Sequence, residues 1–123
     1  HVYILSNYGK WTYEHTAEAL SFLSDVDGQV FSFEVHQIKP EPEIYRTLLD
    51  KFNLVADECV FLDDRRENIE AAETQGIHTV LFTTYQDALE KLKTYGIIHD
   101  NRMLAGCAFY CICSHFYHRF ILL

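Results

Sequence analysis

The chain has 123 residues, of which 49% are hydrophobic and 23% are charged, and its formal net charge is −8. This length allows one domain with a modest core, and the composition is ordinary for a globular protein. The negative charge argues against sequence-independent binding of nucleic acid and against binding to an anionic membrane surface.

The first half of the chain alternates between segments that suit strands and segments that suit helices. Val2–Leu5 is a short apolar run and predicts a buried strand. Residues 16–23 carry apolar side chains at helical spacing, whereas residues 30–35 alternate as in a strand. Pro42 suits the first turn of a helix, and the apolar face of that helix continues to Phe52.

The second half repeats this alternation. Residues 59–62 form a continuous apolar run, as expected for a buried parallel strand. A helix should follow over residues 66–76, because the glycine at its end is a suitable C-terminal cap. Residues 79–82 predict another strand, and a last helix around residues 88–92 is closed by Gly96. Strands alternating with helices predict an α/β fold, with a parallel sheet covered by helices on both faces.

The composition changes after Ile97. Residues 98–123 contain three of the four cysteines and a single acidic side chain, and their apolar residues lack helical spacing. We therefore expect a core domain at 1–97 and a separate tail at 98–123, produced by readthrough or by a shifted reading frame. The polar and basic residues of the tail argue against a membrane span there.

The cysteines divide in the same way. Residues 1–97 contain only Cys59, which is typical of a reduced, cytoplasmic protein. The tail holds cysteines and histidines whose spacing does not match the usual zinc knuckles, so we expect no genuine zinc site there. These tail residues are Cys107, Cys111, Cys113, His115 and His118.

Two adjacent carboxylates, Asp63 and Asp64, follow the strand at 59–62. They therefore lie at the carboxyl end of a parallel strand, where open α/β sheets place their ligands. Adjacent like charges repel each other, and hard oxygen ligands suit Mg²⁺, so the pair predicts a magnesium site. The alternative is that one carboxylate caps the following helix, which would explain one aspartate but not both.

Two further polar motifs stand out. Ser6 and Asn7 follow the first apolar run, and Lys39 precedes the segment Pro40-Glu41-Pro42. The prolines restrain the backbone around Lys39, which an ordinary surface lysine would not require. A cation at this position would offset the charges of a phosphate group and of the acidic pair. The alternatives are a polar turn for Ser6 and Asn7, and a surface side chain for Lys39.

In chain order, three motifs resemble those of the haloacid dehalogenase-like (HAD) phosphohydrolases: Ile4-Leu5-Ser6-Asn7, Lys39-Pro40-Glu41-Pro42 with Ile44 and Tyr45, and Asp63-Asp64 with Asn68. The resemblance covers residues 2–97 and implies a Rossmann-like three-layer parallel sheet. It also implies a Mg²⁺-dependent phosphatase that acts on a small phosphorylated metabolite through an aspartyl-phosphate.

The resemblance also assigns roles to individual residues. Ser6, Asn7 and Lys39 would hold the transferring phosphoryl group, since donors there stabilise the charge that develops on its oxygens. Asp63 and Asp64 would hold the metal, with Asp64 the better direct ligand. Asn68, one helical turn further on, would steady this loop.

The aspartate nucleophile of the family, part of a DxDGT-type motif on the first strand, is missing before Val2. We therefore expect an incomplete core that lacks this strand and the cap domain. Family sheets run in the order 5-4-1-2-3, so a gap should separate the strand of Ser6 from that of Asp63, with unpaired edges, poor stability and no activity. One alternative is that Cys107–Ile112 fills the vacant position. Another is that the chain is a non-catalytic phosphate-binding, metal-binding or regulatory module.

The segment Asp25-Val26-Asp27-Gly28 spells DxDG but makes a poor nucleophile motif. It follows a segment with helical spacing rather than a buried strand, and it comes after the serine motif instead of before it. We expect this segment to be a turn that leads into the next strand.

Overall fold

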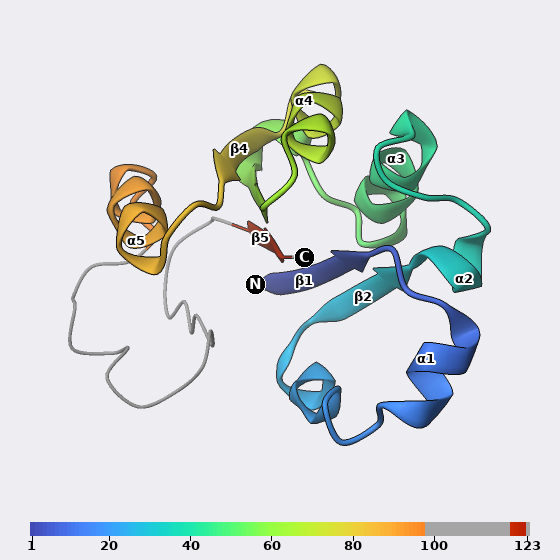
Figure 1. Cartoon of the computed structure of the whole chain (residues 1–123). Coiled ribbons are helices and arrows are strands. Elements are labelled where there is room, and N and C mark those ends of the chain that lie inside the picture. Colours follow the sequence, from blue (N-terminus) through green and yellow to red (C-terminus); the bar gives the residue numbers. More distant parts are fainter. Residues whose placement is uncertain (98–118, 123) are drawn as a thin grey trace.

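The computed structural model describes residues 1–97 and 119–122 (Figure 1). Its strands form one parallel sheet in the order β2-β1-β5-β3-β4. The strands are β1 Val2–Ser6, β2 Gly28–Phe31, β3 Cys59–Asp63, β4 His78–Leu81 and β5 Arg119–Leu122. The α-helices are α1 Lys10–His15, α2 Ser32–Val35, α3 Pro42–Lys51, α4 Arg66–Thr74 and α5 Tyr85–Thr94, and two short 3₁₀ turns cover Ser21–Asp25 and Ala56–Glu58. The predicted α/β class is confirmed.

Helices cover both faces of the sheet, as the buried side chains show. On one face, α3 and α4 pack against the sheet through a cluster that includes Leu48, Ile69 and Phe61. On the other face, α5 packs through a second cluster that includes Leu62 and Leu92. Successive residues of β3 enter opposite clusters because side chains alternate along a strand. The result is the three-layer arrangement that the sequence predicts.

The predicted helix boundaries hold where proline and glycine mark them. Pro42 begins α3. Gly76 and Gly96 follow α4 and α5 with φ angles of 81° and 70°, a left-handed conformation that glycine adopts without steric cost. Within the described ranges, no helix is long and apolar enough to cross a membrane. The cytoplasmic location inferred from cysteine usage stays a prediction.

Two element predictions in the first half are wrong. Residues 16–23 do not form one helix: α1 ends at His15, and a 3₁₀ turn begins only at Ser21. Because the intervening residues 17–19 are exposed, no buried apolar face supports a longer helix. The strand predicted at 30–35 ends at Phe31.

The alternating aromatic residues that suggested a longer strand have another role. Phe33 lies in α2, and its ring stacks on Phe31 with a centroid distance of 6.1 Å. Tyr13 of α1 contacts both rings, at 5.6 and 5.4 Å. The aromatic residues therefore pack as a cluster beside the end of β2 rather than along a continuing strand.

The expected gap in the sheet is filled by β5, which Figure 1 draws in red beside β1. Phe120 pairs with Val2 of β1 and with Val60 of β3, in parallel on both sides. The expectation of unpaired edges at this position is therefore wrong. The strand that fills it belongs to the predicted tail, but Cys107–Ile112, named in the alternative, lies outside the described residues, as do the tail cysteines. The division at residue 97 stays a prediction.

Gly28 provides a test of the packing at β2. A Cβ added at Gly28 would overlap the Phe52 ring, which packs on Tyr3 with a centroid distance of 4.8 Å. We expect Gly28→Ala to lower the free energy of unfolding by about 1–3 kcal/mol, because the ring must move. Gly9→Ala is the matched control, since its Cβ would meet only Thr12 at 3.8 Å. Urea unfolding of both variants would measure the difference, and equal values would contradict the packing.

Candidate active site

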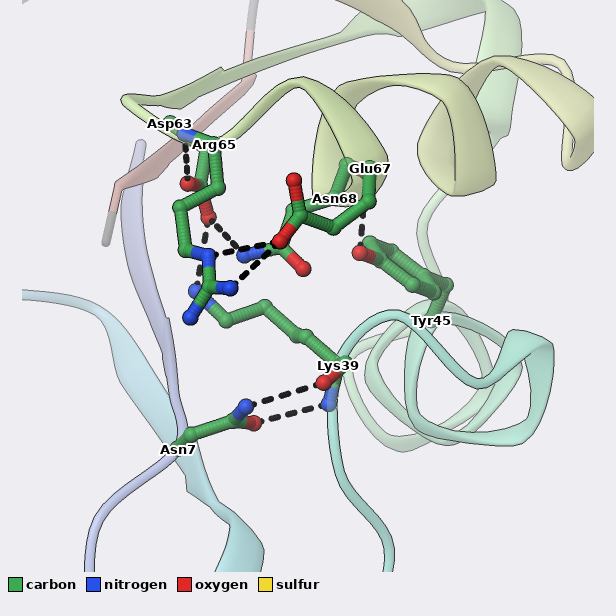
Figure 2. Close-up of polar contacts among 7 residues, drawn as sticks. All are labelled: Asn7, Lys39, Tyr45, Asp63, Arg65, Glu67 and Asn68. Atoms are coloured by element: carbon green, nitrogen blue, oxygen red, sulfur yellow. Dashed lines mark hydrogen bonds and ion pairs between the residues drawn. The ribbon is translucent and has the colours of Figure 1, made fainter.

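The carboxyl edge of the sheet brings together residues that are far apart in the sequence. Ser6 ends β1, Asp63 ends β3, and Lys39 lies in the loop before α3. Since the strands are parallel, their carboxyl ends lie at the same edge, which is where α/β sheets bind ligands. Figure 2 shows the Lys39 side chain extending from its loop to the Asp63 carboxylate. Motifs that were separate in the sequence therefore meet at one edge.

Asp63 is fully buried, with 0% of its surface exposed. Its Oδ2 accepts hydrogen bonds from Lys39 Nζ at 2.8 Å and from Asn68 Nδ2 at 3.0 Å. Its Oδ1 accepts one from the backbone N–H of Arg65 at 2.9 Å. A buried carboxylate is tolerated only when it is paired and hydrogen-bonded, so these three donors offset its burial and fix its orientation.

Lys39 is the partner charge and is itself only 5% exposed. Its Nζ lies 5.6 Å from the centroid of the Phe61 ring, a favourable position for a cation over an aromatic face. Phe61 is buried in β3, so the ammonium lies between an apolar ring and a carboxylate. Lys39 is therefore a buried partner of Asp63 and not a surface lysine.

The Asn7 side chain donates one hydrogen bond to the backbone of Lys39 and accepts another from it. Asn7 Nδ2 donates to the Lys39 carbonyl oxygen at 2.9 Å, and the Lys39 N–H donates to Asn7 Oδ1 at 2.7 Å (Figure 2). Ser6, directly before Asn7, is partly buried at the end of β1. The structure thus ties Asn7 to the lysine loop, while the predicted contacts of Ser6 and Asn7 with a phosphoryl group stay predictions.

Tyr45 supports the site from α3 and is a residue that the sequence did not single out as functional. Its hydroxyl donates to the Asn68 backbone carbonyl at 2.9 Å, and its ring meets Phe61 edge-on at 5.6 Å. Burial, and then the charge of Asp63, raise the pKa of Tyr45, so the hydroxyl remains a hydrogen-bond donor at neutral pH. The only sequence signal was its place in the lysine motif.

Asp64 and Arg65 differ from their neighbour because both are exposed. Arg65 Nε donates to Glu67 Oε1 at 2.8 Å. A backbone hydrogen bond, followed by this arginine, lowers the pKa of Glu67. The N-cap of α4 is Arg65, and no side chain caps this helix end. The helix-cap alternative for the aspartates is therefore wrong, and Asp63 instead bonds to the N–H two residues ahead, as in an Asx turn.

The carboxylate oxygens at this edge are of the type that commonly binds Mg²⁺. Within residues 1–97, no group of three histidine, cysteine or acidic side chains is gathered in one place. Mg²⁺ does not need such a cage, because it commonly binds one or two carboxylates, several waters and phosphate oxygens. Asp64 offers an exposed carboxylate, whereas both oxygens of Asp63 already accept hydrogen bonds. Asp64 is therefore the carboxylate that stays available for direct coordination, and the magnesium site itself stays a prediction.

The DxDG segment lies at the opposite edge of the sheet. Asp27 accepts a hydrogen bond from the N–H of Val2 at 2.7 Å, so it lies beside the first residue of β1. Gly28 then begins β2, which confirms a connection that leads into a strand. Because Ser6 and Asp63 lie at the carboxyl edge, this segment is on the wrong side of the sheet to act with them.

The geometry agrees with a comparison against known families. A family model of haloacid dehalogenase-like hydrolases matches residues 1–76. The chain belongs to this family. The three motifs that resembled the family all lie within the matched range.

Two curated relatives share this part of the chain. The bifunctional epoxide hydrolase 2 of Mus musculus is 40% identical over 67 residues, which are 54% of this chain and 12% of the mouse protein. The phosphorylated carbohydrates phosphatase of Thermotoga maritima is 32% identical over 74 residues, which are 60% of this chain and 28% of that protein. The HAD-like chain therefore spans only a minor part of either relative.

Solved structures show the same fold. An uncharacterized protein from Corynebacterium glutamicum superposes with a TM-score of 0.65 at 25% identity, covering 80% of this chain and 72% of its own. A HAD family enzyme from Bacteroides thetaiotaomicron, solved with magnesium and inorganic phosphate, superposes with a TM-score of 0.62 at 24% identity, covering 68% and 46%. The parallel sheet described above is thus the HAD-like sheet.

Proposed function

We propose that this HAD-like chain carries the phosphoryl-binding and magnesium-binding part of a phosphatase site for a small phosphorylated metabolite. The observation that carries this proposal is the buried pair of Lys39 Nζ and Asp63 Oδ2, 2.8 Å apart at the carboxyl edge of the sheet. The Thermotoga maritima relative is a phosphatase of phosphorylated carbohydrates, which supports the substrate class. The magnesium and phosphate bound to the Bacteroides thetaiotaomicron neighbour support the ligands.

The residues at the edge suit the binding of a phosphate monoester. The Lys39 ammonium has three N–H donors, of which one is directed at Asp63, so donors remain for phosphoryl oxygens. The Ser6 hydroxyl at the end of β1 is a second donor. Asp64 would bind Mg²⁺ directly, and Asp63 would contribute its charge from beside Lys39. The ion would supply positive charge to offset the phosphate oxygens. These cations are needed because the chain is acidic, with a net charge of −8.

For a longer parent protein, we propose that the aspartate of a DxDGT-type motif, which the given sequence lacks, acts as the nucleophile. Its carboxylate oxygen would bond to phosphorus as the bond to the ester oxygen breaks, and the leaving alcohol would take a proton from an acid. Water would then cleave the resulting acyl phosphate and restore the carboxylate. Lys39 and Ser6 would hold the same three oxygens through both steps.

One observation favours a non-catalytic role for this chain on its own. The strand between those of Ser6 and Asp63 is β5, and its sequence Arg119-Phe120-Ile121-Leu122 contains no acidic side chain. We propose that the chain then binds phosphate and Mg²⁺ without turnover. This role corresponds to the alternative inferred from the sequence, a non-catalytic module that binds phosphate and metal.

A binding assay and a turnover assay on the same sample separate these possibilities. Isothermal titration with inorganic phosphate, with and without Mg²⁺, should show saturable binding that requires the metal. Release of p-nitrophenol from p-nitrophenyl phosphate should stay at the background rate. Turnover would instead show a complete catalytic site, and the absence of binding in both conditions would refute the proposal.

Asp64 offers the sharpest variant for this assay. We expect Asp64→Asn to weaken Mg²⁺-dependent phosphate binding about tenfold, because a neutral oxygen replaces a charged ligand. Since Asp64 is exposed, its free energy of unfolding should change by less than about 0.5 kcal/mol. Glu70→Gln removes another exposed carboxylate, on α4, and serves as the control that should not alter binding. Equal affinities for the two variants would exclude Asp64 as a ligand.

A further inference from the structure

Asn7 and Lys39 are 32 positions apart in the sequence, yet their hydrogen bonds close a reciprocal pair between a side chain and a backbone. The pair uses the only acceptor atom of the Asn7 carboxamide and one of its N–H groups. It uses the backbone donor and acceptor of Lys39. The first loop after β1 is therefore tied directly to the residue that supplies the cation of the site.

The Lys39 side chain is held at both of its ends. Asn7 fixes the backbone, and the Asp63 carboxylate fixes Nζ at 2.8 Å. The side chain between these points is buried. Moving the backbone of Lys39 would therefore move Nζ away from Asp63 or compress the side chain against Phe61.

A second reciprocal pair in the same loop is separate from the site. The Tyr8 N–H donates to Ser32 Oγ at 2.9 Å, and that hydroxyl donates to the Tyr8 carbonyl oxygen at 3.1 Å. This pair ties the loop to the start of α2 and does not involve Lys39. Consecutive residues thus make similar bonds to different neighbours, and only the pair at Asn7 reaches the ammonium-bearing residue.

We propose that Asn7 is a positioning residue for Lys39 and not a ligand of the phosphoryl group. This inference rests on the phosphate site proposed above and changes the role that the sequence predicts for Asn7. Asn7 acts by holding the backbone from which the cation extends, and a displacement of about 1 Å at a reacting group is costly. Ser6 and Lys39 remain the side chains that contact the phosphate.

The geometric part of this proposal is tested by NMR spectroscopy of the 123-residue chain. In Asn7→Ala, the backbone amide of Lys39 should exchange with solvent at least about tenfold faster, because it loses its acceptor. The resonance of Lys39 Nζ should also shift. Ser32→Ala removes the comparable pair at Tyr8 and should change neither signal. If Lys39 keeps its protection and its Nζ resonance in Asn7→Ala, the proposal is overturned, whether or not the chain binds phosphate.

The functional part is tested by a double-mutant cycle on phosphate affinity in the presence of Mg²⁺. Asn7→Ala should weaken binding about tenfold in the otherwise unchanged chain, from the loss of two hydrogen bonds that position the cation. In a Lys39→Met background, the same change should alter the affinity less than about twofold. An equal factor in both backgrounds would show that Asn7 contacts phosphate directly. Loss of phosphate binding in the unchanged chain would refute the phosphate site alone, and the NMR result would still decide the role of Asn7.

Discussion

Replacement of Lys39 by methionine should lower the free energy of unfolding by about 3–5 kcal/mol, because it leaves a buried charge without its partner. Asp63 is 0% exposed and would keep only its hydrogen bonds from Asn68 Nδ2 and the Arg65 backbone N–H. Methionine has a similar length, so the loss of packing is small compared with the loss of charge. Urea unfolding followed by circular dichroism at neutral pH would measure the effect.

The double variant Lys39→Met with Asp63→Asn is the control for this prediction. It removes both charges, and it should regain about half or more of the lost stability because no ion is left buried. A single Lys39→Met variant as stable as the original chain would show that the pair is not formed in solution. The phosphate site proposed above would then lose the observation on which it depends.

Replacement of Ile121 by proline should remove the cooperative unfolding transition. Ile121 pairs with Tyr3 of β1 and with Phe61 of β3. Proline has no backbone N–H and is rarely tolerated within a central strand, so the cost should be about 3 kcal/mol or more. Within the described residues, β5 is the only strand that joins the β2-β1 pair to the β3-β4 pair.

Ile121→Val is the matched control because it keeps the backbone donor and a β-branched side chain. It should unfold cooperatively, with a midpoint close to that of the original chain. If the proline variant behaved in the same way, β5 would not occupy the position between β1 and β3 in solution. Amide exchange at Tyr3 and Phe61 would report the same difference strand by strand.

The parts of the site that were predictable are those that depend on local sequence. Asp63 and Asp64 follow an apolar run, which indicates that they lie at the end of a strand. Lys39 is followed by two prolines, which indicates that it lies in a restrained loop. The partner of each residue was less predictable. The sequence indicated that Lys39 would offset the acidic pair, but not that Asn68 Nδ2 and the Arg65 backbone N–H also donate to Asp63. The role of Asp63 at a metal stays a prediction. The hydrogen bond from Lys39 forms because two segments that are distant in sequence lie close together in the fold, and a local sequence pattern does not predict that distance.

The fold shows the same limit. β3 was predictable because its continuous apolar run is typical of a strand buried on both faces. The position of β5 in the sheet was not predictable from its sequence. A four-residue strand is recognised only by its pairing, here with β1 and β3. The prediction of a strand over residues 30–35 was wrong for a related reason. Alternating aromatic residues also suit a cluster around a short helix.

The position of β5 has a consequence for the rate at which this sheet assembles. Val2 pairs with Phe120, so the central ladder joins residues that are almost as distant in sequence as the described chain allows. Proteins dominated by such distant pairings have a high contact order and fold slowly, because the chain loses loop entropy before these contacts form. The two outer strand pairs should therefore form early, and insertion of β5 should be the slow step that unites them.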